Sequence, residues 1–384
     1  MMLPPLSLYI HVPWCIRKCP YCDFNSHQAA ADLPEDAYID ALLEDLKQDL
    51  HWVQGRPVST IFFGGGTPSL LSADAYSRLF SGLRQHLTFI PDIEITLEAN
   101  PGTFEAEKFA DYRRLGINRL SMGIQSFQPQ HLSALGRVHD RDQALTAIAQ
   151  ARDAGFDNFN LDLMHGLPGQ TLEQALDDLN TALSFAPPHL SWYQLTIEPN
   201  TEFYKYPPRL PEDDTLWDIQ EAGFALLAGK GYEHYEISAF SQPGRAARHN
   251  LNYWTFGDYL GIGAGAHGKI TVPTPGNNSL QILRSWKTRL PKDYLNPEKT
   301  FLAGTEKIPE TDTGLECLMN ALRLREGIRR DDFIARTGLQ PAQIAPTIDK
   351  ACQAGLMEAG EWFRATDKGQ QYLNELLALF LPEE

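Results

Sequence analysis

The sequence has no run approaching the ~18 consecutive apolar residues that a membrane-spanning helix requires. Its first residues, Met1–Leu6, lack the basic start and apolar stretch of a signal peptide. Basic residues are scarce as well, since 33 Lys and Arg stand against 49 Asp and Glu and the formal net charge is −16. We therefore predict a cytoplasmic protein whose overall charge repels phosphate backbones, so nucleic-acid partners are not expected.

Cysteine is also sparse, with five residues in a chain of 384. The apolar fraction of 43% and the charged fraction of 21% are those of a globular protein, which excludes disorder and a small disulfide-stapled scaffold. The length suggests about two or three domains. Three of the five cysteines fall within eight residues. In a chain without an export signal, such clustering indicates metal binding before disulfides.

Six short apolar or β-branched segments predict buried parallel strands: Leu6–Val12, Thr60–Phe63, Glu94–Glu98, Arg119–Ile124, Asn158–Leu163 and Trp192–Thr196. Amphipathic helical patterns occupy five stretches in the same region: Tyr38–Leu50, Ala73–Leu87, Glu105–Leu115, Asp140–Ala154 and Leu172–Phe185. This alternation predicts a parallel sheet covered by helices, with its site at the carboxyl ends of the strands. Six repeats favour an α/β fold of the open six-unit (β/α) barrel type over residues 1–200, and a doubly wound sheet is the alternative.

The pattern changes after Pro199. Residues 201–313 contain a Pro-rich connection, a helix at Asp214–Ala228 and strands at His234–Phe240 and Tyr259–Gly263. We predict that this part extends the barrel and is not a separate unit.

A winged-helix-like α+β module is predicted for residues 314–384. Its segments are helices Leu315–Leu324, Asp331–Arg336, Ala342–Ala354 and Gly369–Phe380, with a strand-turn-strand at Leu356–Ala365. The module carries 8 basic and 11 acidic residues, so 8 − 11 gives a net charge of −3. That charge favours a packing or partner-docking role over DNA reading. The apolar stretch Tyr372–Leu381 is expected to close the core of this module, with transient membrane contact as the alternative.

The cysteine cluster, Cys15, Cys19 and Cys22, forms a CxxxCxxC motif directly after the first predicted strand. Zinc normally takes four ligands, often from paired CxxC spacings, whereas three thiolates can hold a [4Fe-4S] cluster and leave one iron open. The alternative is that the three cysteines are unrelated thiols packed in the core, but a loop rich in Lys, Arg and Pro is an unusual core segment. Cys317 and Cys352 lie singly on apolar helix faces, where core packing is expected.

This motif, after the first strand of a six-unit barrel, resembles the signature of the radical S-adenosylmethionine (SAM) family. The resemblance implies a [4Fe-4S] cluster on Cys15, Cys19 and Cys22, with SAM on the fourth iron. The segment that follows the second strand, with Gly65, Gly66 and Thr67, is similar to the family's methionine-binding loop. Glycines permit close backbone approach, so we expect exposed N–H and C=O groups there to bind a small polar ligand.

Polar residues also mark the ends of later strands. Glu98, Gln125 and Asp162 end the third, fourth and fifth predicted strands, and Arg137 follows the fourth. Groups at the carboxyl ends of barrel strands converge on one mouth. By similarity to the family, Arg137 and Glu98 should hold the methionine end of SAM, and Gln125 and Asp162 should lie near its ribose. Tyr9 resembles the tyrosine beside SAM.

Within this family the whole chain resembles the coproporphyrinogen oxidase-like group. The oxidases of that group carry a fourth cysteine where Phe24 stands here, and a longer extension before the first strand. These departures put oxidase activity in doubt and favour the heme chaperones of the group, which share CxxxCxxCxF and an HNxxYW element. The resemblance implies heme, an acceptor heme protein such as a respiratory one, and a structural or switching role for the cluster and SAM. A tetrapyrrole-converting radical SAM enzyme is the alternative.

The HNxxYW element starts at His249 and includes Asn250, Tyr253 and Trp254. An imidazole can ligate heme iron, and flat aromatic side chains can contact a porphyrin. The residues alone favour a structural histidine beside core aromatics, whereas the resemblance favours His249 as the heme ligand, with His267 as a second candidate. Gly261–Ala266 formally fits GxGxxA, but no long helix pattern follows and no dinucleotide site is expected. A homodimer, the mode of heme attachment and SAM turnover are left open.

Overall fold

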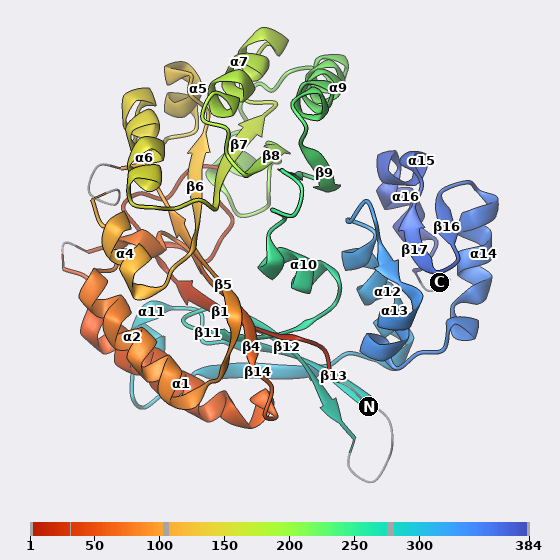
Figure 1. Cartoon of the computed structure of the whole chain (residues 1–384), viewed down its shortest axis with the longest axis horizontal. Helices are drawn as coiled ribbons and strands as arrows, with labels where there is room; N and C mark the ends of the chain where they lie inside the picture. The colour runs from red at the N-terminus through yellow and green to blue at the C-terminus, as the bar shows by residue number, and fades with distance from the viewer. Residues whose placement is uncertain (1–2, 31, 103–106, 275–279, 382–384) are drawn as a thin grey trace.

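The computed structural model describes residues 3–30, 32–102, 107–274 and 280–381. Its frame is a twelve-stranded sheet in the order β14-β13-β12-β11-β1-β4-β5-β6-β7-β8-β10-β9 (Figure 1). Seven central strands run parallel: β11 (Asp258–Ile262), β1 (Leu6–Val12), β4 (Val58–Gly65), β5 (Phe89–Ala99), β6 (Arg119–Gln125), β7 (Phe159–His165) and β8 (His189–Gln194). The accompanying helices are α1 (Glu35–Val53), α2 (Ala73–His86), α4 (Phe109–Leu115), α5 (Pro129–Ala134), α6 (Arg141–Asp153), α7 (Leu172–Leu183) and α9 (Asp213–Gly229).

The strand order decides between the two architectures that the sequence left open. Strands β1, β4, β5, β6, β7 and β8 are neighbours in the order of the chain. Because crossovers between parallel strands are right-handed, this order places the connecting helices on one face of the sheet. A doubly wound sheet would need the order to reverse, so the open six-unit barrel is confirmed. The last predicted strand, Trp192–Thr196, is displaced, since β8 begins at His189. The apolar pattern missed this start because His189 and Ser191, which lie within the sheet, are polar.

The part after the barrel strands differs from the prediction in three ways. The strand expected at His234–Phe240 is wrong, since the chain there forms a hairpin of β9 (Glu233–Glu236) and β10 (Ala239–Ser241). Three antiparallel strands were not expected: β12 (His267–Pro273), β13 (Leu280–Lys287) and β14 (Leu302–Lys307). The HNxxYW element lies on a short helix, α10 (Arg248–Trp254), where no helix was predicted. Strand β12 directly follows Gly261–Ala266, so the expected lack of a helix there is confirmed.

The C-terminal module pairs a three-stranded sheet with short helices, as expected for a winged-helix-like unit. Its elements are α12 (Glu310–Ala321), β15 (Ile328–Arg329), α13 (Arg330–Thr337), α14 (Ala345–Gln353), β16 (Met357–Ala359), β17 (Trp362–Ala365), α15 (Asp367–Gln371) and α16 (Leu373–Ala378). Cys317 is fully buried in its core and Cys352 packs against it, which confirms both as core thiols. The helix expected over Gly369–Phe380 is divided between α15 and α16. Leu376 is fully buried in the same core, so the core-closing interpretation of this stretch is confirmed.

Arg323 is one of the residues that tie this module to the barrel and to α10. The Arg323 guanidinium donates to Glu236 Oε1 at 2.6 Å, and residue Glu236 also forms an isolated bridge with Leu324. On its other side, Arg323 lies 4.4 Å from the ring centre of Trp254. The Arg323 side chain therefore contacts both the edge hairpin and the HNxxYW helix.

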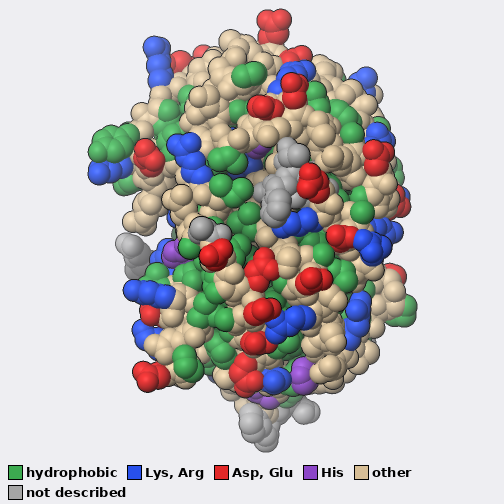
Figure 2. All heavy atoms as spheres, turned by 90° about the vertical axis from the view of Figure 1, so that its left-hand side faces the viewer, with side chains coloured by type: hydrophobic (Ala, Val, Ile, Leu, Met, Phe, Trp, Pro, Cys, Tyr) green, Lys and Arg blue, Asp and Glu red, His purple; other side chains and the backbone are tan. Residues whose placement is uncertain are grey.

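The surface is mixed in charge where Figure 2 shows it. Acidic and basic side chains are interspersed on this face. Among the exposed ion pairs of the protein, Arg78 of α2 pairs with Asp40 of α1 at 2.7 Å. Among the described residues, no helix combines the length and apolar character needed to cross a membrane.

We predict that the frame depends on the buried carboxylate of Asp258 at the start of β11. Asp258 accepts from Lys269 Nζ at 3.0 Å and from Arg56 Nη1 at 2.7 Å. Burial lowers the pKa of Lys269 while Asp258 raises it. Asp258→Asn would leave the Lys269 ammonium buried without its counter-charge, and the free energy of unfolding should fall by about 3–5 kcal/mol in urea titrations.

Asp92→Asn is the matched control, because Asp92 is 78% exposed in its pair with Arg248. This change should cost less than about 1 kcal/mol. Equal losses in the two variants would refute a special role for Asp258.

Candidate cofactor-binding site

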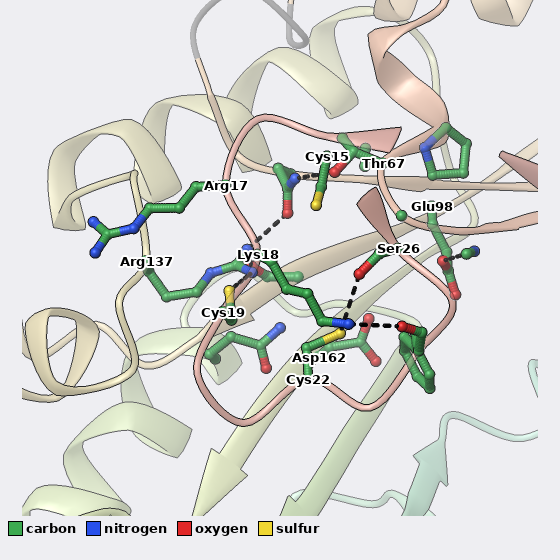
Figure 3. Close-up of a pocket in the computed structure, with 18 of the residues that line it drawn as sticks. Cys15, Arg17, Lys18, Cys19, Cys22, Ser26, Thr67, Glu98, Arg137 and Asp162 are labelled. Atoms are coloured by element: carbon green, nitrogen blue, oxygen red, sulfur yellow. Dashed lines mark hydrogen bonds between the residues drawn. The ribbon is translucent and has the colours of Figure 1, made fainter. Parts of the chain in front are cut away.

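The three clustered cysteines lie on a loop that leaves the carboxyl end of β1. Cys15 ends the short strand β2 (Trp14–Cys15) and is buried, whereas Cys19 and Cys22 are half-buried, and all three are free thiols. Figure 3 shows the loop arching over a cavity that the three sulfurs line. Burial raises the pKa of the Cys15 and Cys22 thiols. A metal ligand has to be a thiolate, so metal binding here would release protons.

The donor set fits a cluster better than a single ion. Among the described residues, no three His, Cys, Asp or Glu side chains converge closely enough to hold one metal ion. The three thiols instead line part of the wall of a cavity of about 310 Å³. In a [4Fe-4S] cluster each thiolate binds a different iron, so its ligands stand further apart than those of one ion.

Most of the residues predicted for the cofactors line this cavity together. They are Cys15, Cys19, Cys22, Gly65, Gly66, Thr67, Glu98, Gln125, Arg137 and Asp162. Asn100, Ser121 and Tyr193 also line it and were not predicted. Asn100 could have been found, because it stands just beyond the end of β5 at Ala99, where the strand-end argument applies. Tyr193 lies near the end of β8, where the same strand-end argument applies.

Arg137 connects the cysteine loop with the strand ends. Its Nη2 atom donates to Asn100 Oδ1 and to the Gly123 carbonyl, both at 2.7 Å, and its Nη1 atom donates to Cys19 Sγ at 3.6 Å. Its Nε atom is buried with no hydrogen-bond partner among the described residues. A buried donor without a partner is costly, and an anionic ligand group in the cavity would satisfy it.

Two carboxylates face the same cavity. Glu98 Oε2 accepts from the Gly65 N–H at 3.2 Å, and Asp162 Oδ2 accepts from the Ser121 hydroxyl at 2.9 Å. Burial, together with the charge of Asp162, raises the pKa of Glu98 to about 8. A positively charged ligand would relieve this repulsion. The cavity therefore offers acidic groups to a cation and Arg137 to an anion, which suits a zwitterion.

The glycine loop agrees only in part with the expectation that its backbone N–H and C=O groups are exposed to a ligand. The N–H groups of Gly66 and Thr67 donate to the carbonyls of Val12 and Trp14, and the Gly65 N–H donates to Glu98. These N–H groups are therefore not available to a ligand, and carbonyl oxygens are the polar groups that it could meet. A Cβ atom on Gly66 would lie 2.4 Å from the Trp14 carbonyl oxygen, so glycine here allows the loop to pack under the cysteine loop.

The backbone at the end of β6 is strained. Gln125 has a φ of 68°, in the left-handed region that non-glycine residues avoid. Its side-chain Oε1 accepts from the Tyr193 hydroxyl at 3.0 Å, which holds the amide at the cavity wall. Such strain concentrates at binding sites, where the fold fixes a side chain in one orientation.

A second cavity of about 500 Å³ adjoins the first and shares Phe24, Gly65 and Glu98 with it. Its lining is rich in aromatic and imidazole groups: Tyr9, His11, His249, Tyr253, Tyr259, His267 and Trp286. Tyr9 belongs to this cavity and not to the lining of the first, so its placement differs from that of the other residues predicted for SAM. Its hydroxyl bonds His11 Nδ1 at 2.9 Å.

Helix α10 divides the HNxxYW residues between two surroundings. His249 and Tyr253 are four residues apart, so they share a helix face, and both line the second cavity. Asn250 and Trp254 are not part of that lining, and Trp254 packs on Tyr253 and Arg323 instead. Burial lowers the pKa of His249 to about 3, so its imidazole is neutral at ordinary pH. A neutral imidazole is the form that ligates iron.

Known proteins resemble this chain over its full length. Residues 9–182 match the radical SAM superfamily model and residues 308–372 match the HemN C-terminal domain. The chain is 52% identical to the heme chaperone HemW of Escherichia coli over 99% of both chains, and 51% identical to that of Haemophilus influenzae over 100% of this chain and 99% of the other. Among solved structures, coproporphyrinogen III oxidase (HemN) from Escherichia coli matches with a TM-score of 0.82 at 25% identity, covering 98% of this chain and 90% of that one.

We predict that Glu98 destabilises the cofactor-free protein at high pH. Unfolded, this carboxyl ionises near 4.5, whereas the folded protein retains its proton up to about pH 8. Ionisation therefore opposes folding between these values, and the penalty grows as pH rises. Glu98→Gln should raise the unfolding free energy on the order of 1–3 kcal/mol at about pH 8 and change it little near pH 4.5, as measured by denaturant titration at each pH.

Glu44→Gln serves as the control for this comparison. Glu44 lies on α1 with 54% of its side chain exposed. Its variant should follow wild type at every pH. A Glu98→Gln protein that is no more stable than wild type at pH 8 would show that the carboxyl ionises freely in the fold.

Proposed function

The chain belongs to the HemW family of heme chaperones within the radical SAM superfamily, and from this premise we propose that it binds heme and passes it to an acceptor heme protein. One observation carries the proposal. Helix α10 presents His249 and Tyr253 together to an aromatic cavity of about 500 Å³, next to the cavity that the three cysteines line. The 52% identity to a heme chaperone over 99% of both chains favours this role over the oxidase alternative, as does Phe24 at the place of a fourth cysteine.

The cysteine-lined cavity would hold the cluster and SAM. Cys15, Cys19 and Cys22 would bind three irons of a [4Fe-4S] cluster and leave the fourth open to SAM. The unpaired Nε of Arg137 supports its role at the SAM carboxylate, and the repulsion between Glu98 and Asp162 supports placing the cationic part of SAM beside them. Thr67, Gln125, Gly65 and Gly66 complete the walls. Bound together, the cluster and SAM supply one-electron chemistry, which here would act as a switch.

The adjoining cavity would hold heme. His249 would ligate the iron, and Tyr253, Tyr259 and Trp286 would contact the porphyrin faces and edges. Arg289 lies at the rim, exposed to solvent, and its guanidinium suits a heme carboxylate. His267 is the second candidate ligand in the same cavity and is exposed.

Partners and location follow from the same chemistry. A cluster on reduced thiolates fits the cytoplasm, where glutathione keeps thiols reduced. The acceptor would be a heme protein, such as a respiratory one, reached with or without transient contact at a membrane. A homodimer would place two such cavities in one assembly.

We predict that Cys19 is necessary for the cluster. Cys19→Ala should abolish the broad charge-transfer absorption of the reconstituted protein, because one of three iron ligands is lost. Cys317→Ala and Cys352→Ala are the controls and should retain the absorption, since these thiols pack in the C-terminal core. A requirement for Cys317 or Cys352 would show that the ligand set is wrong.

We predict that His249→Ala weakens heme binding on the order of tenfold or more and changes the Soret band, because an axial ligand is removed. Anaerobic heme titrations would measure both effects. His51→Ala, an exposed histidine on α1, should behave like wild type, and His267→Ala tests the second candidate. Heme binding that is unchanged in His249→Ala would refute this ligand.

Transfer itself is measured by mixing the heme-loaded protein with an apo heme protein and following the acceptor's absorption. Heme that never leaves this chain would contradict a chaperone role. Conversion of coproporphyrinogen III to protoporphyrinogen IX under reducing, oxygen-free conditions would favour the enzyme instead.

A further inference from the structure

His249 belongs to a buried polar network that crosses three elements. The Oγ1 atom of Thr60, on β4, lies 2.8 Å from Nδ1 of His249 and 2.7 Å from the hydroxyl oxygen of Ser7 on β1. Asn252, one turn after His249 on α10, donates its Nδ2 to the same Ser7 hydroxyl at 2.8 Å. Ser7 and Thr60 are 1% and 2% exposed, so water does not compete for these contacts.

The network fixes which imidazole nitrogen carries the proton. Asn252 Nδ2 also donates to the Asp258 carbonyl at 3.0 Å, which sets the orientation of its amide. The Thr60 hydroxyl donates its one proton to Ser7, so toward His249 it can only accept. With this direction, Nδ1 of His249 is the nitrogen that donates to Thr60, and Nε2 keeps its lone pair.

Resting on the proposed heme-binding function, we propose that Thr60 is a positioning residue that holds His249 in the Nδ1-protonated form with Nε2 available to heme iron in the second cavity. Iron-ligating histidines need their other ring nitrogen held by an acceptor, which orients the ring and increases its basicity. Thr60 supplies that acceptor. The ring is also held from one side by Phe62, at 5.0 Å between centroids.

The backbone of α10 is fixed independently of Thr60. Glu94 of β5 accepts from the N–H groups of Arg248 and His249 at 3.1 Å and 3.0 Å. A carboxylate at the first N–H groups of a helix stabilises its start. Replacing Thr60 should therefore alter the histidine ring and leave the helix in place.

Thr60→Val removes the acceptor and nearly preserves shape, whereas Thr60→Ser retains the hydroxyl. We expect roughly 10–100-fold weaker heme binding and a shifted Soret band in Thr60→Val, with both restored in Thr60→Ser. Thr96→Val is the matched control, because Thr96 is also buried in the sheet and its hydroxyl has no partner among the described residues. That variant should bind heme as wild type does.

A second measurement needs no heme. In long-range ¹H–¹⁵N spectra of histidine-labelled protein, the His249 signal, assigned by its loss in His249→Gln, should show a protonated Nδ1 in wild type and Thr60→Ser. In Thr60→Val that preference should be lost. An Nε2-protonated His249 in wild type, or unchanged heme binding in Thr60→Val, would overturn the proposal. Wild type that binds no heme while His249 keeps its Nδ1 proton would instead refute the chaperone function alone.

Discussion

The parallel register of β1, β4 and β5 is the constraint on which both cavities depend. It sets Ser7 beside Thr60 and Thr60 beside Glu94, a polar row that seats helix α10. Further along the same strands it brings Gly65 and Glu98 to the rim under the cysteine loop. Side chains alternate along a strand, so a shift of one residue would turn both rows to the opposite face. One register thus positions two binding regions.

The cysteine cavity could be predicted because its signals are local in the sequence. Cys15, Cys19 and Cys22 follow a strand at once, and Glu98 and Asp162 stand near strand ends. Parallel strands bring such positions together whatever the details of packing. Its hydrogen bonds could not be predicted in the same way. The N–H groups of the glycine loop are engaged by Val12 and Trp14, and no pattern in the loop itself reveals these partners.

The second cavity could not be predicted from the sequence, because residues that are far apart in the chain line it. Helix α10 has no side-chain cap from its own segment, and Glu94, about 155 positions earlier, takes that place. Strand β13 carries Lys287 into the core only because Asp45 and Asp49 of α1 compensate its charge. Such pairs follow from tertiary structure, and propensity within the segment gives no sign of them. The HNxxYW spacing was visible in the sequence. Which of its residues face the second cavity and which face the C-terminal module became clear only once the element was known to be a helix.

Phe24, Gly65 and Glu98 are common to the walls of the two cavities. A molecule that moves any of them on entering one cavity changes the free energy of binding in the other. Thermodynamic reciprocity makes this influence equal in both directions: by whatever factor an occupant of the cysteine cavity strengthens or weakens binding in the second cavity, an occupant of the second cavity alters the affinity for the first by the same factor. The occupants of the two cavities would then influence each other's affinity through these three shared residues.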